Sequence, residues 1–367
     1  MTNFFLRNFP PPKWLEIPAF GLDISDRSFK FVELRAQNGR LALGRFGRKA
    51  VGEGILQSGE IKNKDALIEL LASSFHSMRG EAVAVSLPEE KAFVGSATLP
   101  KMAPGEVREA LEVGLEEYIP LPAGEAVFDF EIVKTDENLD HTDVMIVAFP
   151  RSLVQNYLEV VKAAGLRPSV FQMEVHALAR ATLAEDSKES AMLVDFGRTR
   201  TSFIIVSGGM VRFTSTVALA GEELDRAISK TLGVDVFEAE RLKKEWGLVR
   251  ASESKKIFGA LLPTVSSIKD EISRHLIFWK SHAQHLHVPS PEVRQIYLAG
   301  GDANLRGFSE YLSYEFKLPV KLANPWVNIT DFENYIPEIT YRESLSYGTA
   351  LGLALGAGRK NNFVELP

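Results

Sequence analysis

Two short segments in different halves of this chain follow the same pattern, and together they limit what it can fold into. Residues 23–34 and 195–206 each begin with an aspartate that ends an apolar stretch, pass through a turn of small or polar residues, and enter a second apolar stretch. Two such hairpins facing each other across a cleft can hold the phosphates of one nucleotide, because small turn residues let backbone N–H groups approach phosphate oxygens. Each aspartate can also hold Mg²⁺, directly or through water.

A third candidate contact with a phosphate or nucleoside is the turn Gly300-Gly301, which follows a predicted strand at residues 295–299. Paired glycines at a strand end leave bare backbone on which a flat ring or a sugar can lie. A tight turn explains the two glycines equally well. Taken alone, each of the two hairpin turns is also more often an ordinary turn than a phosphate site.

Three further patterns carry weaker signals. Glu240, Lys243 and Lys244 gather on one face of a predicted helix, where a solvated surface is the favoured explanation. Glycines at 348, 352 and 356 recur every four residues in an apolar stretch that is too short for a membrane helix, so we expect close packing inside a soluble body. The histidines at 275, 282, 285 and 287 do not share one helix face and have no interleaved carboxylate, so metal binding there is not favoured.

Composition excludes several classes of function. The chain has 367 residues, which favours two to three domains or subdomains, and its formal net charge of -6 argues against non-specific nucleic-acid binding. It contains no cysteine, which excludes disulfides, thiolate metal sites and cysteine catalysis. No apolar run is long enough to span a bilayer, and the first residues lack the pattern of a signal peptide. We therefore expect a cytoplasmic protein without a transmembrane segment.

Hydrophobic periodicity predicts alternating strands and helices, with an inserted α+β subdomain at about 87–167. Within it we expect strands at 91–99, 127–134 and 143–149 and helices at 105–118 and 153–164. Outside it we expect two or three antiparallel strands within 20–43, a buried strand at 81–87, and strands at 191–206 and 211–217. The expected helices outside the insert lie at 65–75, 173–184, 221–231, 235–246, 262–283, 305–316 and 347–355.

The two hairpins, the turn at 298–301 and the closing helix at 347–352 occur in the order found in the actin/Hsp70/sugar-kinase ATPase superfamily. More narrowly, the chain resembles the PilM family of actin-like type IV pilus assembly proteins. The likeness extends over about 19–356. The stretches that carry it are 21–24, 30–34, 99–100, 116–122, 128–130, 163–166, 221–225 and 323–325.

The resemblance implies an α/β, ribonuclease H-like fold of two lobes with an inserted 1C subdomain. The N-terminal extension that we expect at 1–18 is not part of the usual family pattern, and a C-terminal tail follows at 359–367. Lobe 1 would comprise 19–86, a connecting helix at 168–190 and a closing helix at 338–358, with 1C at 87–167. Lobe 2 would comprise 191–222 and 295–337, with subdomain 2B at 223–294.

The resemblance also assigns roles to residues of the nucleotide site. Asp23 and Asp195 correspond to the two aspartates near Mg²⁺, and Glu174 to the polar residue that orients attacking water. The positions that correspond to contacts with ATP or ADP are Ser25, Asp26, Lys30, Gly197, Arg198, Thr199, Gly221, Glu240, Lys243, Lys244, Gly300 and Gly301.

The first turn departs from the family pattern, which is usually Asp-Ile-Gly-Ser. Here Ser25 replaces the glycine and narrows the approach of the backbone to phosphate, and Asp26 adds a negative charge. We therefore expect nucleotide binding with slow or absent hydrolysis.

The function that the resemblance implies is an ATP-binding scaffold at the inner face of the cytoplasmic membrane. Its partner would be the cytoplasmic tail of a PilN-like inner-membrane protein, held at a groove beside Tyr118, Ile119, Pro120 and Leu121. Two alternatives remain open. An FtsA-like cell-division protein would end in an amphipathic membrane helix, for which residues 356–367 look too short and too weakly apolar. A small-molecule kinase would need a carboxylate base at a substrate pocket, and the sequence offers no convincing one.

Overall fold

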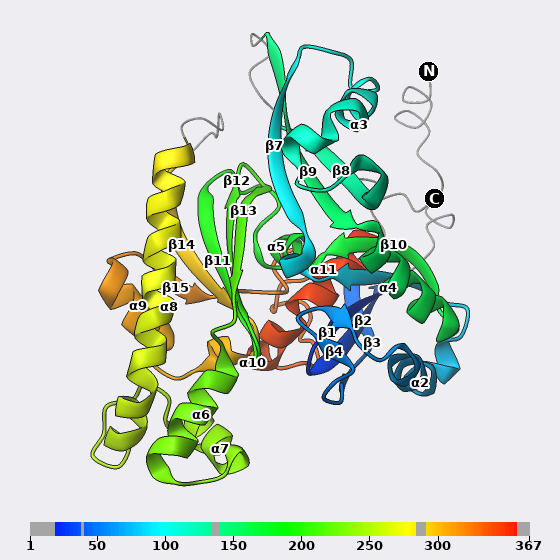
Figure 1. The fold of residues 1–367 in the computed structure, drawn as a ribbon. Coiled ribbons are helices and arrows are strands. Elements are labelled where there is room, and N and C mark those ends of the chain that lie inside the picture. Colours follow the sequence, from blue (N-terminus) through cyan, green and yellow to red (C-terminus); the bar gives the residue numbers. More distant parts are fainter. Residues whose placement is uncertain (1–18, 38–39, 134–139, 284–290, 358–367) are drawn as a thin grey trace.

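The computed structural model describes residues 19–37, 40–133, 140–283 and 291–357. The predictions for the extension at 1–18, for the tail at 359–367 and for His285 and His287 lie outside these residues. Within them the chain forms two lobes, each built on a five-stranded sheet, and a smaller unit that stands on one end of the molecule (Figure 1).

The two five-stranded sheets share one topology, which explains the repeated hairpin. The strand order is β3-β2-β1-β6-β10 in lobe 1 and β13-β12-β11-β14-β15 in lobe 2. In each sheet the first three strands pair antiparallel to one another, and the last two strands run parallel to the central strand. The aspartate of each hairpin ends the central strand. The strands of lobe 1 are β1 (Ala19–Ser25), β2 (Ser28–Gln37), β3 (Arg40–Ala50), β6 (Ala82–Leu87) and β10 (Arg167–Met173), with the small pair β4 (Leu56–Gln57) and β5 (Glu60–Ile61). Those of lobe 2 are β11 (Ser190–Phe196), β12 (Thr201–Ser207), β13 (Met210–Val217), β14 (Val293–Ala299) and β15 (Val320–Leu322).

Helices cover both faces of the lobe 1 sheet. Along β1, Phe20, Leu22 and Ile24 point into the core formed with α2 (Lys64–Ser74) and α4 (Arg151–Ala163). The opposite face meets α11 (Gly348–Ala357), which crosses α5 (Glu174–Thr182). Nine of the ten residues of α11 are buried, as expected for a helix that is apolar on all sides.

The glycines at 348, 352 and 356 allow this close crossing. A Cβ atom at Gly352 would meet the carbonyl oxygen of Ala177 in α5, and one at Gly348 would meet the side chain of Leu178. The prediction of close packing is therefore confirmed for these residues. In the part of the chain that the structure describes, no helix has the length and apolar character needed to cross a bilayer.

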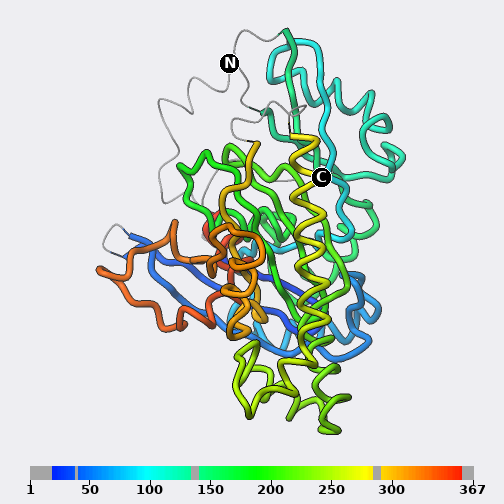
Figure 2. The backbone as a smooth tube through the Cα atoms, turned by 90° about the vertical axis from the view of Figure 1, so that its left-hand side faces the viewer, coloured from blue at the N-terminus to red at the C-terminus, as the bar shows by residue number. Residues whose placement is uncertain are grey.

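Lobe 2 is extended by helices at the end opposite the insert, an arrangement that both views show (Figures 1 and 2). The long helix α8 begins at Lys255, two turns earlier than predicted, and contains Pro263. Burial of Ile257 and Leu261 on the same face as Val265 offsets the hydrogen bond that proline cannot donate. The helices are α6 (Gly221–Leu232), α7 (Val236–Trp246), α8 (Lys255–His282) and α9 (Phe308–Phe316), and α10 (Tyr341–Ser344) leads into α11.

The insert, which we define as residues 93–150, is a three-stranded antiparallel sheet in the order β7-β9-β8, covered by α3. It has its own core between sheet and helix, whereas α4, predicted to belong to it, packs against α2 and β10 in lobe 1. The strand β10 was not predicted, because its buried residues form a short run without alternation. The elements of the insert are β7 (Phe93–Pro100), α3 (Val107–Tyr118), β8 (Ala126–Ile132) and β9 (His141–Pro150).

The crossing of α11 over α5 yields a stability prediction. Gly352→Ala should lower the free energy of unfolding by about 1–3 kcal/mol, since the added methyl group overpacks the contact with Ala177. The control is Gly259→Ala in α8, where an added Cβ meets no neighbour within 4 Å and alanine favours the helix. Urea unfolding of both variants measures the difference. Equal stability of the two would contradict the close crossing.

Candidate functional site

A cavity of about 820 Å³ lies between the two lobes, and both predicted hairpin turns reach it. Lobe 1 contributes Asp23, Ser25 and Lys30, and lobe 2 contributes Asp195 and the turn at 197–200. We call this cavity the cleft. The shared topology of the sheets explains the convergence, because each turn follows the central strand of its own sheet.

Asp23 is held firmly in lobe 1. Its side chain is buried, one oxygen accepts a hydrogen bond from Ser86 Oγ at 3.1 Å, and the other lies 3.4 Å from Lys30 Nζ. Ser25, next along the turn, donates its hydroxyl to the carbonyl of Ser28 at 2.8 Å. The first turn is thus ordered by its own side chains.

Asp195 occupies the matching position in lobe 2. Burial in the cleft, with further contributions from Glu174 and Asp23, raises the pKa of this carboxyl group to about 7. Beside it Gly300 has φ +88°, and a Cβ there would meet the Asp195 carboxylate and the carbonyl of Phe196. Only glycine fits this position, so the predicted turn serves to bring bare backbone against the second hairpin.

These carboxylates fit a divalent cation that also binds phosphate. Lys30 is bonded to Asp23 and Arg200 to Glu174, so the three carboxyl groups of Asp23, Glu174 and Asp195 face two cationic side chains. Burial and the neighbouring carboxylates raise the pKa of Asp195, and a bound cation would relieve that crowding. Among the described residues no cluster of three metal-ligating side chains exists. A Mg²⁺ ion would therefore take most of its ligands from water and phosphate, as is usual for Mg²⁺ in nucleotide sites.

Asp26 does not line the cleft, contrary to the role expected from its place in the first turn. Its carboxylate accepts the backbone N–H groups of Ser58 and Gly59, each at 3.1 Å. These two residues form the β4–β5 turn and have positive φ angles, so the aspartate stabilises a strained turn. The additional negative charge at position 26 is consequently directed away from the phosphate region.

The wall formed by α6 and α7 is a network of ion pairs. Arg198 Nη1 lies 3.1 Å from Asp225 and 3.3 Å from Glu240, and Glu240 pairs with Lys244 at 2.7 Å. Besides Asp23, Ser25, Lys30 and Asp195, the predicted residues that line the cleft are Glu174, Gly197, Arg198, Thr199, Glu240, Lys244, Gly300 and Gly301.

Lys243 and Gly221 lie behind this wall. Lys243 is buried, with Nζ 3.0 Å from Asp225 and 2.6 Å from Asp302, so the alternative of a solvated face is wrong for this residue. A Cβ at Gly221 would meet the Asp302 carboxylate. The two residues position carboxylates of the wall and do not themselves face the cleft.

Arg200 is the most important residue that the sequence reasoning missed. It extends from the second hairpin into lobe 1, where its guanidinium lies 3.0 Å from Glu174 and 3.1 Å from Glu90. Asp26 is 3.9 Å away. Glu174 therefore has a charged partner and also accepts the backbone N–H of Glu89 at 3.2 Å. The signal available in the sequence was the place of Arg200 in the repeated hairpin.

A second ion pair crosses the mouth of the cleft. Arg27 of the first turn donates to Glu222 at the start of α6 at 2.8 Å, and Arg226 reaches the same carboxylate at 3.1 Å. Arg198 Nε lies 3.8 Å from it. In this arrangement Arg27, Arg198 and Arg226 are already paired with carboxylates.

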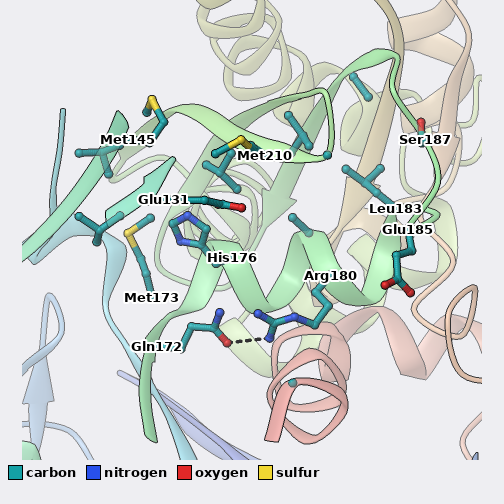
Figure 3. A pocket seen from close by; sticks show the side chains of 18 of the residues that line it. Glu131, Met145, Gln172, Met173, His176, Arg180, Leu183, Glu185, Ser187 and Met210 are labelled. Carbon is teal, nitrogen blue, oxygen red and sulfur yellow. Dashed lines mark hydrogen bonds between the residues drawn. The ribbon is translucent and has the colours of Figure 1, made fainter. Parts of the chain in front are cut away.

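The predicted partner groove at 118–121 has a different character. Ile119 is buried in the core of the insert, Tyr118 and Leu121 pack against that core, and Pro120 is exposed. The turn thus closes the insert on the α3 side. The opposite face of the insert sheet borders a separate cavity of about 500 Å³ at its seam with both lobes (Figure 3). We call this second space the seam cavity.

A profile of the family described as type IV pilus assembly protein PilM matches residues 21–357. The chain belongs to this family. A solved structure described as a PilM-PilN type IV pilus biogenesis complex superposes with a TM-score of 0.78 at 25% identity, covering 94% of this chain and 99% of the other. The resemblance inferred from the sequence is confirmed.

More distant relatives place the family in the actin-like fold. MreB5 of Spiroplasma citri, solved with ADP, has a TM-score of 0.52 at 17% identity over 87% of this chain and 94% of the other. The ethanolamine utilization protein EutJ from Carboxydothermus hydrogenoformans reaches 0.55 at 16% identity, covering 97% and 95%. These likenesses confirm the predicted actin-like fold class.

Curated relatives are cell division proteins FtsA. That of Neisseria meningitidis is 24% identical over 207 residues, which is 50% of this chain and 48% of the relative. That of Pseudomonas aeruginosa is 26% identical over 202 residues, with the same shares. The chain spans about half the length of the curated relatives it matches.

The segment beside Arg200 yields a pH prediction. Burial raises the pKa of Glu89 from 4.5 to about 7, and Thr214 and Thr216 of β13 donate hydrogen bonds to it. The folded state therefore holds a proton that the unfolded state releases, so the free energy of unfolding should fall as the pH rises from about 4.5 to about 7.

Glu89→Gln should flatten this slope by up to about 1.4 kcal/mol per pH unit, since glutamine keeps the acceptor oxygen without the charge. Urea unfolding at several pH values measures the slope. The exposed Glu109 provides the control Glu109→Gln, which should leave the slope unchanged. Parallel curves for the wild type and Glu89→Gln would contradict the burial argument.

Proposed function

We propose that this chain is an ATP- or ADP-binding scaffold of type IV pilus assembly, in which nucleotide binding rather than turnover is the function. The observation that carries the proposal is the convergence of two hairpins, each ending in an aspartate, on one cleft between lobes of the same topology. Membership of the PilM family and an actin-like fold, which MreB5 shares in structures with ADP and AMPPNP, support it.

The cleft offers separate contacts for the phosphates, the cation, and the base and sugar of a nucleotide bound with Mg²⁺. Backbone at Ser25 and at 197–199 would approach the phosphates from the two lobes, and Asp23 and Asp195 would hold the cation through water. The base and sugar would lie toward Glu240, Lys244 and the Gly300-Gly301 backbone. Phosphate would compete with Glu222 for Arg27 and Arg198, so entry of nucleotide exchanges one set of ion pairs for another.

The geometry around Glu174 supports the proposal of slow hydrolysis. Both of its carboxylate oxygens accept hydrogen bonds from Arg200. With the backbone N–H of Glu89, these bonds take three of the roughly four acceptor positions of the carboxylate, and the ion pair makes it a weaker base toward a water molecule. We therefore propose that the bound nucleotide braces the lobes and is turned over slowly or not at all.

Calorimetric titration with Mg²⁺ and ATP or ADP tests the nucleotide site. The wild type should bind, and Asp195→Ala should weaken binding at least about tenfold, because it removes one of two cation-binding carboxylates. The matched control Glu109→Ala, on the exposed face of α3, should bind as the wild type does. No binding by the wild type at millimolar nucleotide would overturn the proposal.

The same family membership supports a membrane-anchored partner. We propose that the cytoplasmic tail of a PilN-like inner-membrane protein binds at the seam cavity, which would place this chain at the inner face of the cytoplasmic membrane. The solved PilM-PilN complex to which the chain is similar supports this partner. The edge strand β8 contributes Asp129, Phe130 and Glu131 to the cavity, and an extended peptide can add to such an edge through main-chain hydrogen bonds.

A peptide that copies the cytoplasmic tail of a PilN-like protein tests this site. Reversing a rim charge with Glu131→Lys should weaken peptide binding several-fold without unfolding the chain, because Glu131 lines the cavity. Glu109→Lys, a charge reversal on the other side of the insert, serves as the control. Fluorescence anisotropy measures the affinity, and equal weakening by both variants would contradict the seam cavity as the site.

Two alternative functions predict different results. A small-molecule kinase would turn over at about 1–1,000 per second with a suitable acceptor, as ordinary enzymes do. A coupled assay against sugars would detect that rate. An FtsA-like protein would form filaments with nucleotide, which sedimentation would detect. The pairing of Glu174 with Arg200 disfavours the kinase. The PilM family profile over residues 21–357 disfavours the FtsA-like protein.

A further inference from the structure

Arg48 is a cation of the cleft that has no carboxylate partner. It lies on β3 in lobe 1 and lines the cleft, and within the described residues its guanidinium makes no hydrogen bond or ion pair. The other lysines and arginines of the lining are each paired with a carboxylate; they are Arg27, Lys30, Arg198, Arg200, Arg226 and Lys244. An anion can therefore bind Arg48 without breaking an existing pair.

The strand register explains how a residue of the edge strand reaches the cleft. Asp23 of β1 lies opposite Lys30 of β2, and Lys30 lies opposite Arg48 of β3. Opposite residues of an antiparallel pair point to the same face of the sheet, and all three of these residues line the cleft. With about 4.8 Å between neighbouring strands, the row runs roughly 10 Å from Asp23 to Arg48. Arg48 thus stands at the outer end of a row that begins at a cation-binding carboxylate.

Lys30 and Arg48 repel each other in the absence of an anion. Like charges directly opposite on neighbouring strands are destabilising. Lys30 Nζ lies 3.4 Å from an Asp23 oxygen, which offsets its charge, whereas Arg48 has no such contact. A phosphate group beside the two side chains would relieve this repulsion, and a charged donor strengthens its hydrogen bonds.

The position of Arg48 along a bound nucleotide follows from the Gly300-Gly301 turn. The N–H of Gly300 donates to the carbonyl of Leu345 at 3.1 Å, and a Cβ at Gly301 would lie 3.7 Å from Ser346. The segment 345–347, which precedes α11 in lobe 1, therefore packs against the turn on which the sugar would lie in the proposed function.

The same segment borders β3. The ring of Tyr347 packs edge-on against Phe46 of β3, with 6.3 Å between the ring centroids. Burial and Glu343 raise the pKa of the Tyr347 hydroxyl, and the guanidinium of Arg48 is close enough to oppose that rise. Arg48 thus lies toward the sugar end of the cleft and away from the two aspartates.

A basic residue on an edge strand can also serve only to keep other strands from pairing there. Lys49, the next residue of β3, suits that role, since it is exposed, lies opposite Phe29 and does not line the cleft. Arg48 differs from Lys49 in facing the cleft. Comparison of the two residues therefore separates a phosphate contact from protection of the edge.

We propose that Arg48 binds the inner phosphate of a nucleotide in the cleft, the phosphate that is attached to the sugar. A cation held by Asp23 and Asp195 would neutralise the outer phosphates, and Arg48 would neutralise the inner one. A guanidinium suits this task because its forked donors match two phosphate oxygens. The inference rests on the proposed function, because it assigns a further residue within that nucleotide site.

Calorimetric titration of Arg48→Ala with Mg²⁺-ATP and with Mg²⁺-ADP tests this role. The variant should bind each nucleotide about tenfold more weakly than the wild type, since both contain the inner phosphate and a charge-assisted contact is worth about that factor. The ratio of the two affinities should stay unchanged. Arg48→Lys should recover part of the loss, because lysine keeps the charge without the forked geometry.

Lys49→Ala is the matched control. It removes the same charge from the neighbouring position of β3 and should bind both nucleotides as the wild type does. Without nucleotide, Arg48→Ala should unfold at a temperature equal to or above that of Lys49→Ala, because it removes the repulsion from Lys30. A lower unfolding temperature for Arg48→Ala would show a structural role for the arginine and overturn the proposal.

The remaining outcomes separate this inference from the proposed function. Weakening confined to ATP would overturn it in favour of a contact with the terminal phosphate, and equal weakening by Lys49→Ala would overturn it in favour of a general charge effect. Unchanged affinities in Arg48→Ala would overturn it while the proposed function stands, since the wild type still binds. Failure of the wild type to bind either nucleotide at millimolar concentration would instead overturn the proposed function, and the role of Arg48 with it.

Discussion

The most buried ion-pair contact that we describe between the two lobes is made by one guanidinium. Arg200 leaves the second hairpin, crosses the interface and meets carboxylates of lobe 1 with 13% of its side chain exposed. Removing one member of such a buried set leaves an uncompensated charge and typically costs about 3–5 kcal/mol. The partners of Arg200 lie beside Asp23 and Asp195, so this ion pair also sets the distance across which a nucleotide would be held.

The same interaction connects the cleft to the insert. Glu90 bonds to Arg200 and Glu89 bonds to Thr216 of lobe 2, and both residues lie immediately before β7, the first strand of the insert. A change in the spacing of the lobes therefore acts on the base of the insert. The seam cavity is bordered by the insert, by α5 and by strands of lobe 2, so its shape follows from the same contacts.

The sequence predicted features that depend on backbone geometry. The repeated hairpins, the tight turn at Gly300 and the crossing allowed by Gly352 all rest on small residues at fixed positions, and such positions are visible without a structure. Membership of the family, once recognised, placed most of the cleft residues. In the sequence, the shared topology of the two sheets was visible only in the similar pattern of their hairpins.

Features that depend on long-range side-chain partners could not be predicted in this way. Asp26 turns away from the cleft because the β4–β5 turn offers two N–H groups. Lys243 is buried because it pairs with Asp225 and Asp302, which lie on other elements. Ile119 lies in the core of the insert because α3 folds over its sheet. In each case the partner is distant in sequence, and no local pattern identifies it.

A crystal structure grown with Mg²⁺ and ADP tests the central claim most directly. The account predicts phosphates between the turn at 25–28 and the turn at 197–199, a cation held through water by Asp23 and Asp195, and the Arg27–Glu222 pair opened. Nucleotide bound elsewhere, or phosphates at this site with neither aspartate near the cation, would contradict it.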